Sequence, residues 1–173
     1  KWVYLEGIFF GSADIMNELP ADYNKFKSID SEFTQLMKKV SNKPLIFKVM
    51  EIPNLKSTLE EKIKTALERI QKALYNFLEK QRQNFARFYF IGDEDLLEII
   101  GNSKDVMKIT RHFNKMFAGM NALICKDGNE MSGMISREFE EVPFEKSVKI
   151  SDDPVVYQWL TKVEDQMHFT LAT

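Results

Sequence analysis

Apolar residues recur at intervals of three and four positions along most of the chain, which is the period of a helix with one buried face. One such helix is predicted from Pro20 to about Ser41, and its apolar positions are Tyr23, Phe26, Ile29, Phe33, Leu36, Met37 and Val40. It ends before Pro44, because the residue that precedes a proline is disfavoured in the helical conformation. We predict a helix tail over residues 2–9 before it, then a break over 11–14, and a short helix over 44–51 after it.

The longest predicted element is a helix from Leu55 to about Asn84, which contains no glycine or proline. At 1.5 Å per residue, such a helix extends about 45 Å. Its apolar stripe comprises Leu55, Leu59, Ile63, Leu67, Ile70, Leu74, Phe77 and Leu78. The stripe covers about three heptads and other helices flank it, so packing within a stack of helices is favoured over a two-stranded coiled coil.

The helical period is interrupted at the aromatic run Phe88–Ile91, for which we predict a short extended crossing. Gly92–Asp95 then opens a helix that ends at Gly101, because acidic residues favour the first turn of a helix and glycine favours the position after its last turn. A further helix is predicted from Asn102 or Ser103 to Gly119.

After this helix the period changes to that of strands. Residues 121–125 and 131–137 flank Asp127-Gly128, which is the strongest hairpin-turn signal in the chain. Residues 141–144 and 147–150 add one or two more strands, and Pro143 requires its strand to lie at an edge of the sheet.

A final helix is predicted to start over residues 151–154 and to continue to the end of the chain. The fold class is therefore mainly α: an elongated helical bundle or stack of six or seven helices, with a small inserted antiparallel β-hairpin sheet. We expect a helical subdomain over 1–120, the inserted sheet over 121–151, and the truncated start of a next helical subdomain over 152–173. Both ends fall within apolar patterns, whereas domain boundaries favour polar segments, so we interpret the chain as a piece of a longer polypeptide.

Composition excludes several classes of protein. The net charge of −2 gives no electrostatic footprint for nucleic acid. The single cysteine, Cys125, allows no internal disulfide and fits a reducing compartment. No apolar run approaches the roughly 18–20 residues that span a bilayer, so no membrane association is expected.

Catalytic chemistry is not indicated by any motif. Gly101–Lys104 lacks the second glycine and the spacing of a phosphate loop, so a turn between helices is favoured. Asp93–Asp95 are adjacent on a helix and diverge, which favours helix N-terminal charges over a metal site. Asp127–Glu130 lacks the ligand spacing of a calcium loop. His112 and His168, with one cysteine, cannot build a zinc site from soft ligands alone. We therefore predict no catalytic residue, cofactor or metal.

Two arginines lie beside aromatic residues and present nucleic-acid binding as an alternative. Arg82 and Arg87 lie on either side of Phe85, and Arg87 directly precedes Phe88 and Tyr89. Arginine and aromatic side chains can stack on nucleic-acid bases. Without a wider basic stripe, packing of the aromatic rings in the core beside a flanking cation is favoured.

Nine segments, in chain order and over essentially the whole chain, resemble the linker of dynein heavy chains. They are Trp2–Phe9, Ser12–Ile15, Leu19-Pro20, Phe26–Ile29, Leu36-Met37, Ile70–Leu74, Phe88–Phe90, Leu96–Gly101 and Lys115–Phe117. Within that family, residues 11–14, 92–95 and 101–104 resemble the cytoplasmic branch. The chain departs from the family pattern at Ala86, where proline is frequent, and at Phe139, where a turn glycine is frequent.

The resemblance implies a mechanical role without catalysis in this segment. The dynein linker is a helical arm that lies across a ring of six AAA+ modules, and it bends and straightens as the first module turns over ATP. The implied partners are the AAA+ ring of the same heavy chain and, indirectly, microtubules, within a homodimeric parent molecule in the cytoplasm and on the cytoskeleton. The alternative is a non-motor helical docking scaffold that binds partner helices.

Helical rods bend at breaks in the helical pattern rather than within uninterrupted turns. We therefore expect the hinge or the contact with the ring at the two interruptions, and the candidate residues are Arg87, Phe88, Tyr89, Phe90, Lys126, Asp127 and Asn129. For Phe88 and Phe90, burial in the core under the small sheet is the favoured interpretation. Arg87 and the hairpin tip are the stronger candidates for contact with the ring.

Overall fold

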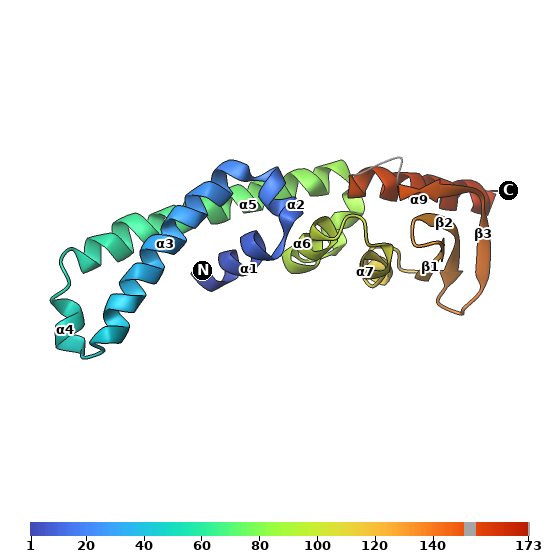
Figure 1. Ribbon diagram of the computed structural model, residues 1–173. Helices are drawn as coiled ribbons and strands as arrows, with labels where there is room; N and C mark the ends of the chain where they lie inside the picture. The colour runs from blue at the N-terminus through green and yellow to red at the C-terminus, as the bar shows by residue number, and fades with distance from the viewer. Residues whose placement is uncertain (151–154, 173) are drawn as a thin grey trace. The chain divides into compact units, whose positions relative to one another are not determined.

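The computed structural model describes residues 1–150 and 155–172, and the fold is mainly α with one small antiparallel sheet, as predicted (Figure 1). The chain forms two compact units, Lys1–Phe77 and Leu78–Thr173. Within the described residues there are nine α-helices, more than the six or seven predicted. The excess arises because residues 13–18 form a helix of their own and because the helix predicted over 102–119 is divided. The expected division into functional subdomains stays a prediction.

The first unit consists of five helical elements and the beginning of a sixth. They are α1 (Trp2–Gly11), α2 (Ala13–Glu18), α3 (Pro20–Asn42), α4 (Ile46–Met50), a π-helical segment (Ser57–Lys64) and the first part of α5 (Thr65–Asn84). Ser12 starts α2, because its hydroxyl oxygen accepts a hydrogen bond from the Ile15 N–H group at 3.3 Å. Pro20 occupies the first turn of α3, as predicted.

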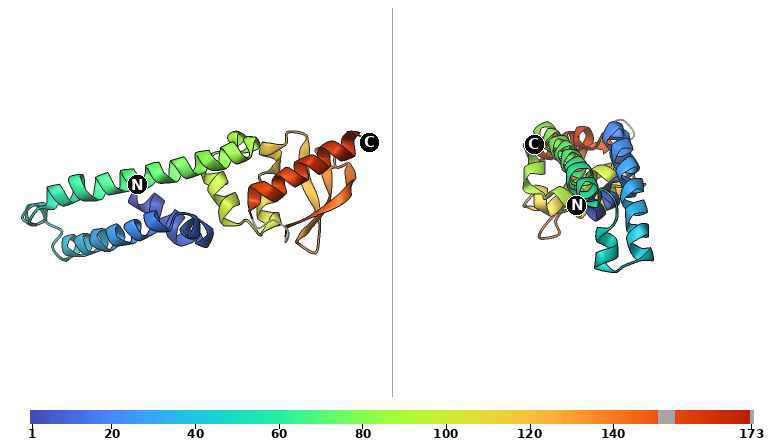
Figure 2. Two further views of the ribbon diagram at one scale, coloured as in Figure 1. Left: turned by 90° about the horizontal axis from the view of Figure 1, so that it is seen from above. Right: turned by 90° about the vertical axis from the view of Figure 1, so that its left-hand side faces the viewer.

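The core of the first unit lies between α1, α2 and α3. Phe9 stacks on Phe26 with ring centroids 5.6 Å apart, and both side chains are buried together with Leu5 and Ile15. Ion pairs reinforce the packing at the surface: Lys62 of the π-helical segment lies 2.7 Å from Glu32 of α3, beside which it runs (Figure 2). The hydrogen bond and positive charge of Lys1 lower the pKa of Glu68 below its ordinary value.

The long helix predicted from Leu55 to Asn84 is present, but its first part is not α-helical. Residues Ser57–Lys64 form a π-helix that passes directly into α5. The apolar stripe is buried from Ile63 onward, whereas Leu55 and Leu59 are half-buried. The helix thus loses its tightly packed face toward the end where the π geometry occurs.

The second unit begins with the last turns of α5 and continues through short helices. A 3-10 helix (Ala86–Phe90) follows, then α6 (Asp93–Gly101), α7 (Val106–Thr110) and α8 (Phe113–Met116). The predicted extended crossing at 88–91 is therefore wrong. The N–H groups of Phe88 and Ile91 donate to the carbonyls three residues before them, and this closes two tight turns.

The helix predicted over 102–119 is also wrong in its extent, because it is two helices. Asp105, rather than Asn102 or Ser103, caps α7: its carboxylate accepts a hydrogen bond from the Lys108 N–H group at 3.2 Å. His112 separates α7 from α8.

The sheet contains β1 (Met120–Lys126), β2 (Glu130–Ser136) and β3 (Glu141–Lys149), in that order and antiparallel. The predicted turn between β1 and β2 is confirmed: Asp127 and Gly128 both have positive φ (53° and 72°), and the Asn129 N–H group donates to the Lys126 carbonyl at 3.4 Å. Lys126 pairs with Glu130, so the three residues Asp127, Gly128 and Asn129 connect the strands. The predicted segments 141–144 and 147–150 belong to one strand, which ends at Lys149, and Pro143 lies on this edge strand as predicted.

Helix α9 (Val156–Ala172) packs against the sheet, and its buried face includes Trp159, Leu160 and Val163 (Figure 2). Side chains of α9 also reach the edge strand: Gln166 Oε1 accepts a hydrogen bond from the Lys146 N–H group at 3.3 Å. The helix start predicted at 151–154 lies outside the described residues.

The two positions at which the chain departs from the family pattern have distinct backbone conformations. Phe139, in the turn between β2 and β3, has φ 64°, which lies in the left-handed region that favours glycine. Its ring is 74% exposed, so little packing offsets the strain. Ala86 is the first residue of the 3-10 helix, and Phe85 before it is extended (φ −140°, ψ 103°), as a residue before proline prefers.

We predict that Phe139→Gly stabilises the chain. A side chain in the left-handed region costs about 1–2 kcal/mol, and the greater backbone entropy of glycine in the unfolded state offsets about half of that gain. The free energy of unfolding should rise by about 0.5–1 kcal/mol, measured by urea denaturation with circular dichroism. Phe139→Ala is the matched control: it removes the same exposed ring and keeps the strain. Equal stability of the two variants would contradict the prediction.

Candidate hinge and contact site

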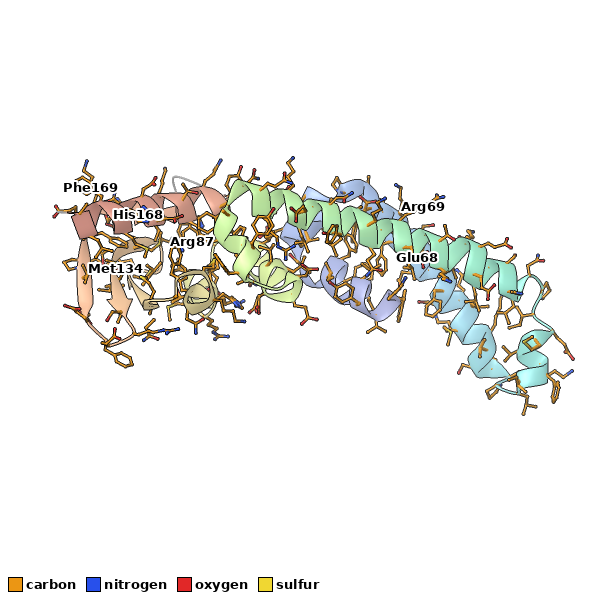
Figure 3. All side chains as sticks on the ribbon, turned by 180° about the vertical axis from the view of Figure 1, so that it is seen from behind. Glu68, Arg69, Arg87, Met134, His168 and Phe169 are labelled. Atoms are coloured by element: carbon orange, nitrogen blue, oxygen red, sulfur yellow. The ribbon has the colours of Figure 1, made fainter. Side chains whose placement is uncertain are left out.

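Arg87 is the most extensively bonded of the predicted site residues. Its Nε donates a hydrogen bond to Glu164 Oε1 of α9 at 2.7 Å, and its Nη1 donates to the Met116 carbonyl at the end of α8 at 3.0 Å. The guanidinium carbon lies 4.3 Å from the centre of the Phe117 ring. Figure 3 shows Arg87 beneath α9. Arg87 therefore anchors the 3-10 helix inside the second unit.

The aromatic residues of the 3-10 helix divide into one buried and two exposed side chains. Phe88 is fully buried and packs edge-on against Phe85, with ring centroids 5.0 Å apart, as predicted for a core residue. Phe90 was expected in the core as well, but it is 69% exposed, because the 3-10 turn directs it away from Phe88. Tyr89 is also exposed, and its hydroxyl donates to Glu79 Oε1 of α5 at 2.6 Å.

Arg82 forms a second bridge across the same break, a role that the sequence did not indicate. Its Nη2 lies 2.6 Å from Asp93 Oδ1 and donates to the Ile91 carbonyl at 3.3 Å. The arginine side chain is buried, so its charge must be paired where it lies. The bridge connects the end of α5 to the first residue of α6. The arginine and the acidic helix start were both visible in the sequence, but nothing local relates them.

His112 lies buried between two carboxylates of α6. Its Nδ1 is 3.4 Å from Asp95 Oδ1 and its Nε2 is 3.2 Å from Glu98 Oε2. Lys115 also contacts Asp95, at 2.7 Å. Among the described residues no group of three or more histidine, cysteine, aspartate or glutamate side chains could hold a metal ion. The acidic residues of α6 thus have structural partners in Lys115 of α8 and in His112, the residue before α8.

The hairpin tip presents a separate exposed group. Lys126, Asp127 and Asn129 are all exposed, and the Asn129 carbonyl accepts a hydrogen bond from the Ile150 N–H group at 3.0 Å. This bond ties the tip to the end of β3. Strand β1 begins at Met120, just after the end of α8 that Arg87 contacts. At a rise of about 3.3 Å per residue, β1 places the hairpin tip about 20 Å from its own first residue. The two predicted groups therefore do not form one site.

The glycine-containing segment 101–104 forms the turn between helices that the sequence favours. Helix α6 ends at Gly101 and α7 begins at Val106. The Asn102 amide donates to the Glu98 carbonyl at 2.8 Å and accepts from Lys108 Nζ at 2.7 Å, so its polar groups are occupied by the turn itself.

His168 is exposed on α9 (Figure 3). Within the described ranges, no helix has the length and apolar character needed to cross a bilayer.

We predict that Arg87→Ala destabilises the second unit by about 2 kcal/mol, because two charge-assisted hydrogen bonds and one ring contact are lost. The Arg87–Glu164 pair is roughly one third exposed, so the coupling in a double-mutant cycle with Glu164→Ala should be only about 1 kcal/mol. Urea denaturation of the four proteins measures it. Arg87→Lys should recover only part of the loss, since lysine has no planar fork of donors. Fully additive single mutants would show that the ion pair carries no stability.

Comparison with known proteins places these features in a family. The family model described as "Dynein heavy chain, N-terminal region 2" matches residues 1–173. Proteins named "Dynein heavy chain, cytoplasmic" from Paramecium tetraurelia and Dictyostelium discoideum are 58% and 53% identical over 99% and 100% of this chain. The protein of the same name from Drosophila melanogaster is 51% identical over 100% of it. The chain spans 4% of the length of each of these relatives. The chain therefore belongs to the dynein heavy chain family, in its N-terminal region 2.

Proposed function

We propose that this chain is a mechanical linker segment of a cytoplasmic dynein motor, which bends and straightens over the AAA+ ring and so couples ATP turnover to movement along microtubules. The observation that carries the proposal is the match of the whole chain to the N-terminal region of dynein heavy chains whose names are cytoplasmic. ATP turnover takes place in the ring, further along the heavy chain, and this segment has no catalytic role of its own.

The partners and location follow from the same proposal. The direct partner is the AAA+ ring of the same heavy chain, microtubules are reached indirectly, and the parent heavy chain is a homodimer in the cytoplasm and on the cytoskeleton. A force-transmitting segment must resist deformation under load. The Arg82 and Arg87 bridges support that role, because they tie the non-α interruption after α5 to α6, α8 and α9.

The contacts also separate the candidate residues by role. Arg87 and Phe88 are internal anchors of the second unit, so we assign them to the stiffness of the arm rather than to contact with the ring. Tyr89, Phe90 and the hairpin tip at Lys126, Asp127 and Asn129 are exposed, and we assign contact with the ring to these two surfaces.

The long helix should be essential for force transmission but not for ATP hydrolysis. Leu67→Pro in the complete motor removes a helical hydrogen bond and clashes with the preceding turn, at a cost of about 3 kcal/mol or more. We expect ATP hydrolysis to persist while microtubule gliding slows strongly. Leu67→Met is the matched control, because it conserves volume and helix propensity. If a folded Leu67→Pro motor glides at an unchanged speed, the long helix does not transmit force. That result would favour the alternative function, a docking scaffold without a power stroke.

Charge reversal tests the hairpin tip as a contact with the ring. In the complete motor, Lys126→Glu should reduce nucleotide-driven linker movement, measured by distance-sensitive fluorescence, because an exposed cation at a contact becomes a repulsive anion. Lys104→Glu makes the same charge change at an exposed turn outside the hairpin. Equal movement in both variants and the wild type would place the contact elsewhere.

A further inference from the structure

Helix α4 and the residue before it expose a continuous set of large apolar side chains. Leu45, Ile46, Phe47 and Met50 are 68%, 71%, 83% and 72% exposed, and we call these four residues the α4 surface. None of the five residues of α4 is buried. So short a helix is marginal in water without tertiary packing, and clustered exposed apolar side chains are typical of interaction sites.

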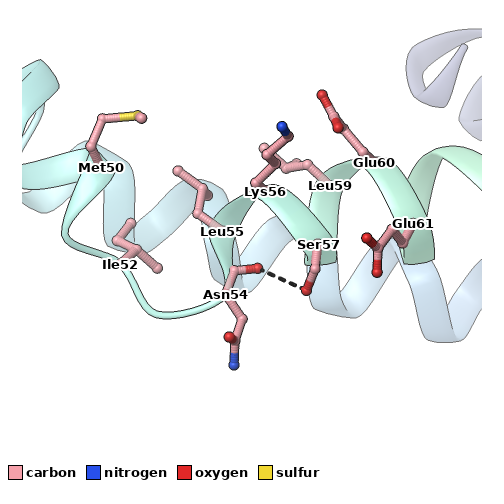
Figure 4. A pocket seen from close by; sticks show the side chains of 9 residues that line it. All are labelled: Met50, Ile52, Asn54, Leu55, Lys56, Ser57, Leu59, Glu60 and Glu61. Carbon is pink, nitrogen blue, oxygen red and sulfur yellow. Dashed lines mark hydrogen bonds between the residues drawn. The ribbon is translucent and has the colours of Figure 1, made fainter.

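An open groove of about 690 Å³ continues the α4 surface (Figure 4). Its apolar lining is Met50, Ile52, Leu55 and Leu59, which belong to α4, the following turn and the beginning of the long helix. Met50 is shared by the surface and the groove, so the two form one apolar strip. A strip of this kind suits an amphipathic helix, which inserts residues spaced by three, four and seven positions.

The charges around the strip are strongly asymmetric. Residues 38–56 contain five lysines and one glutamate, a net charge of +4 in a chain whose total is −2. Lys48 is paired with Glu51 at 3.0 Å. Across the described parts of the chain, no carboxylate forms an ion pair with Lys39, Lys43 or Lys56. Unpaired lysines beside an apolar strip complement a partner that carries acidic flanks.

We infer that the α4 surface and its groove are the docking site for an acidic amphipathic helix of the same heavy chain, outside residues 1–173. The chain accounts for 4% of the length of its relatives, so most of the polypeptide lies outside it. A tethered helix has a high effective concentration, which makes so small a surface sufficient. This site is independent of the proposed stroke.

A membrane surface is the competing partner, since lysines beside apolar side chains also bind anionic lipids. The groove argues against it. Glu60 and Glu61 line the groove together with the apolar residues, and carboxylates at this position repel anionic headgroups. An acidic helix can place its carboxylates on the flank beside the lysines and keep the flank beside these glutamates uncharged, which a uniformly anionic membrane surface cannot do.

Zero-length carbodiimide cross-linking of the complete heavy chain, without nucleotide, identifies the occupant. The reagent joins a lysine amine to a carboxylate in direct contact with it. We expect Lys43 and Lys56 to be joined to aspartate or glutamate residues of one helix outside 1–173. Mixing isotopically labelled and unlabelled heavy chains distinguishes links within one chain from links between two. Links between chains, or no links, would overturn the inference.

A substitution at the strip provides the second readout. Oxidation of Met50 by hydroxyl radicals should rise about tenfold in the Phe47→Glu heavy chain, if the tethered helix occupies about nine tenths of the wild-type sites. Met107→Glu is the matched control, because Met107 is equally exposed on α7 (70%). An unchanged Met50 rate in Phe47→Glu, or protection that appears only with phosphatidylserine vesicles, would overturn the inference. Both readouts are taken without nucleotide, so a failed stroke does not affect them.

Discussion

The second unit depends on one cation placed where the long helix stops. The 3-10 turn after α5 is closed by two backbone hydrogen bonds, and both lie within the turn, so they do not connect it to other elements of the unit. Arg87 supplies the missing restraint, since its guanidinium contacts Glu164 on α9, the carbonyl of Met116 and the face of Phe117. Arginine suits this place because its planar fork donates in two directions while its face stacks on a ring. Two elements distant in sequence, α9 and the end of α8, are thereby fixed to one turn.

The remaining polar groups of this unit follow from that restraint. Once the turn is fixed, Arg82 of α5 faces the first residue of α6 and pairs with Asp93. The same acidic helix start presents Asp95 and Glu98 to His112. A buried ion pair is weak evidence for stability, but removing one partner leaves an uncompensated charge. The Arg82–Asp93 pair therefore constrains the direction of the chain after α5, because a path that separated the two residues would leave the buried guanidinium unpaired.

Sequence periodicity was sufficient where burial follows a regular spacing. It predicted α3, the buried stripe from Ile63 onward and the hairpin at Asp127-Gly128. It failed at Phe88–Phe90, because a run of aromatic residues followed by a β-branched one is typical of strands, while a 3-10 turn buries one ring and exposes the next two. For the candidate site, the interruption was predictable but the partner of Arg87 was not. Glu164 lies 77 residues away, and no local pattern relates the two residues.

The cations of the chain divide into two populations with different physical consequences. Arg82 and Arg87 are satisfied internally, so their charge contributes to shape and little to the outer field. Lys56 lines the groove, and Lys43 lies two residues before the exposed Leu45 in the sequence; both carry strongly hydrated ammonium groups without an ion-pair partner among the described residues. The lining of the groove includes Ser57, Leu59, Glu60 and Glu61, where the long helix adopts the less stable π geometry. Irregular backbone, exposed apolar surface and unpaired charge therefore coincide at one end of the first unit, which is where an external partner gains most by binding.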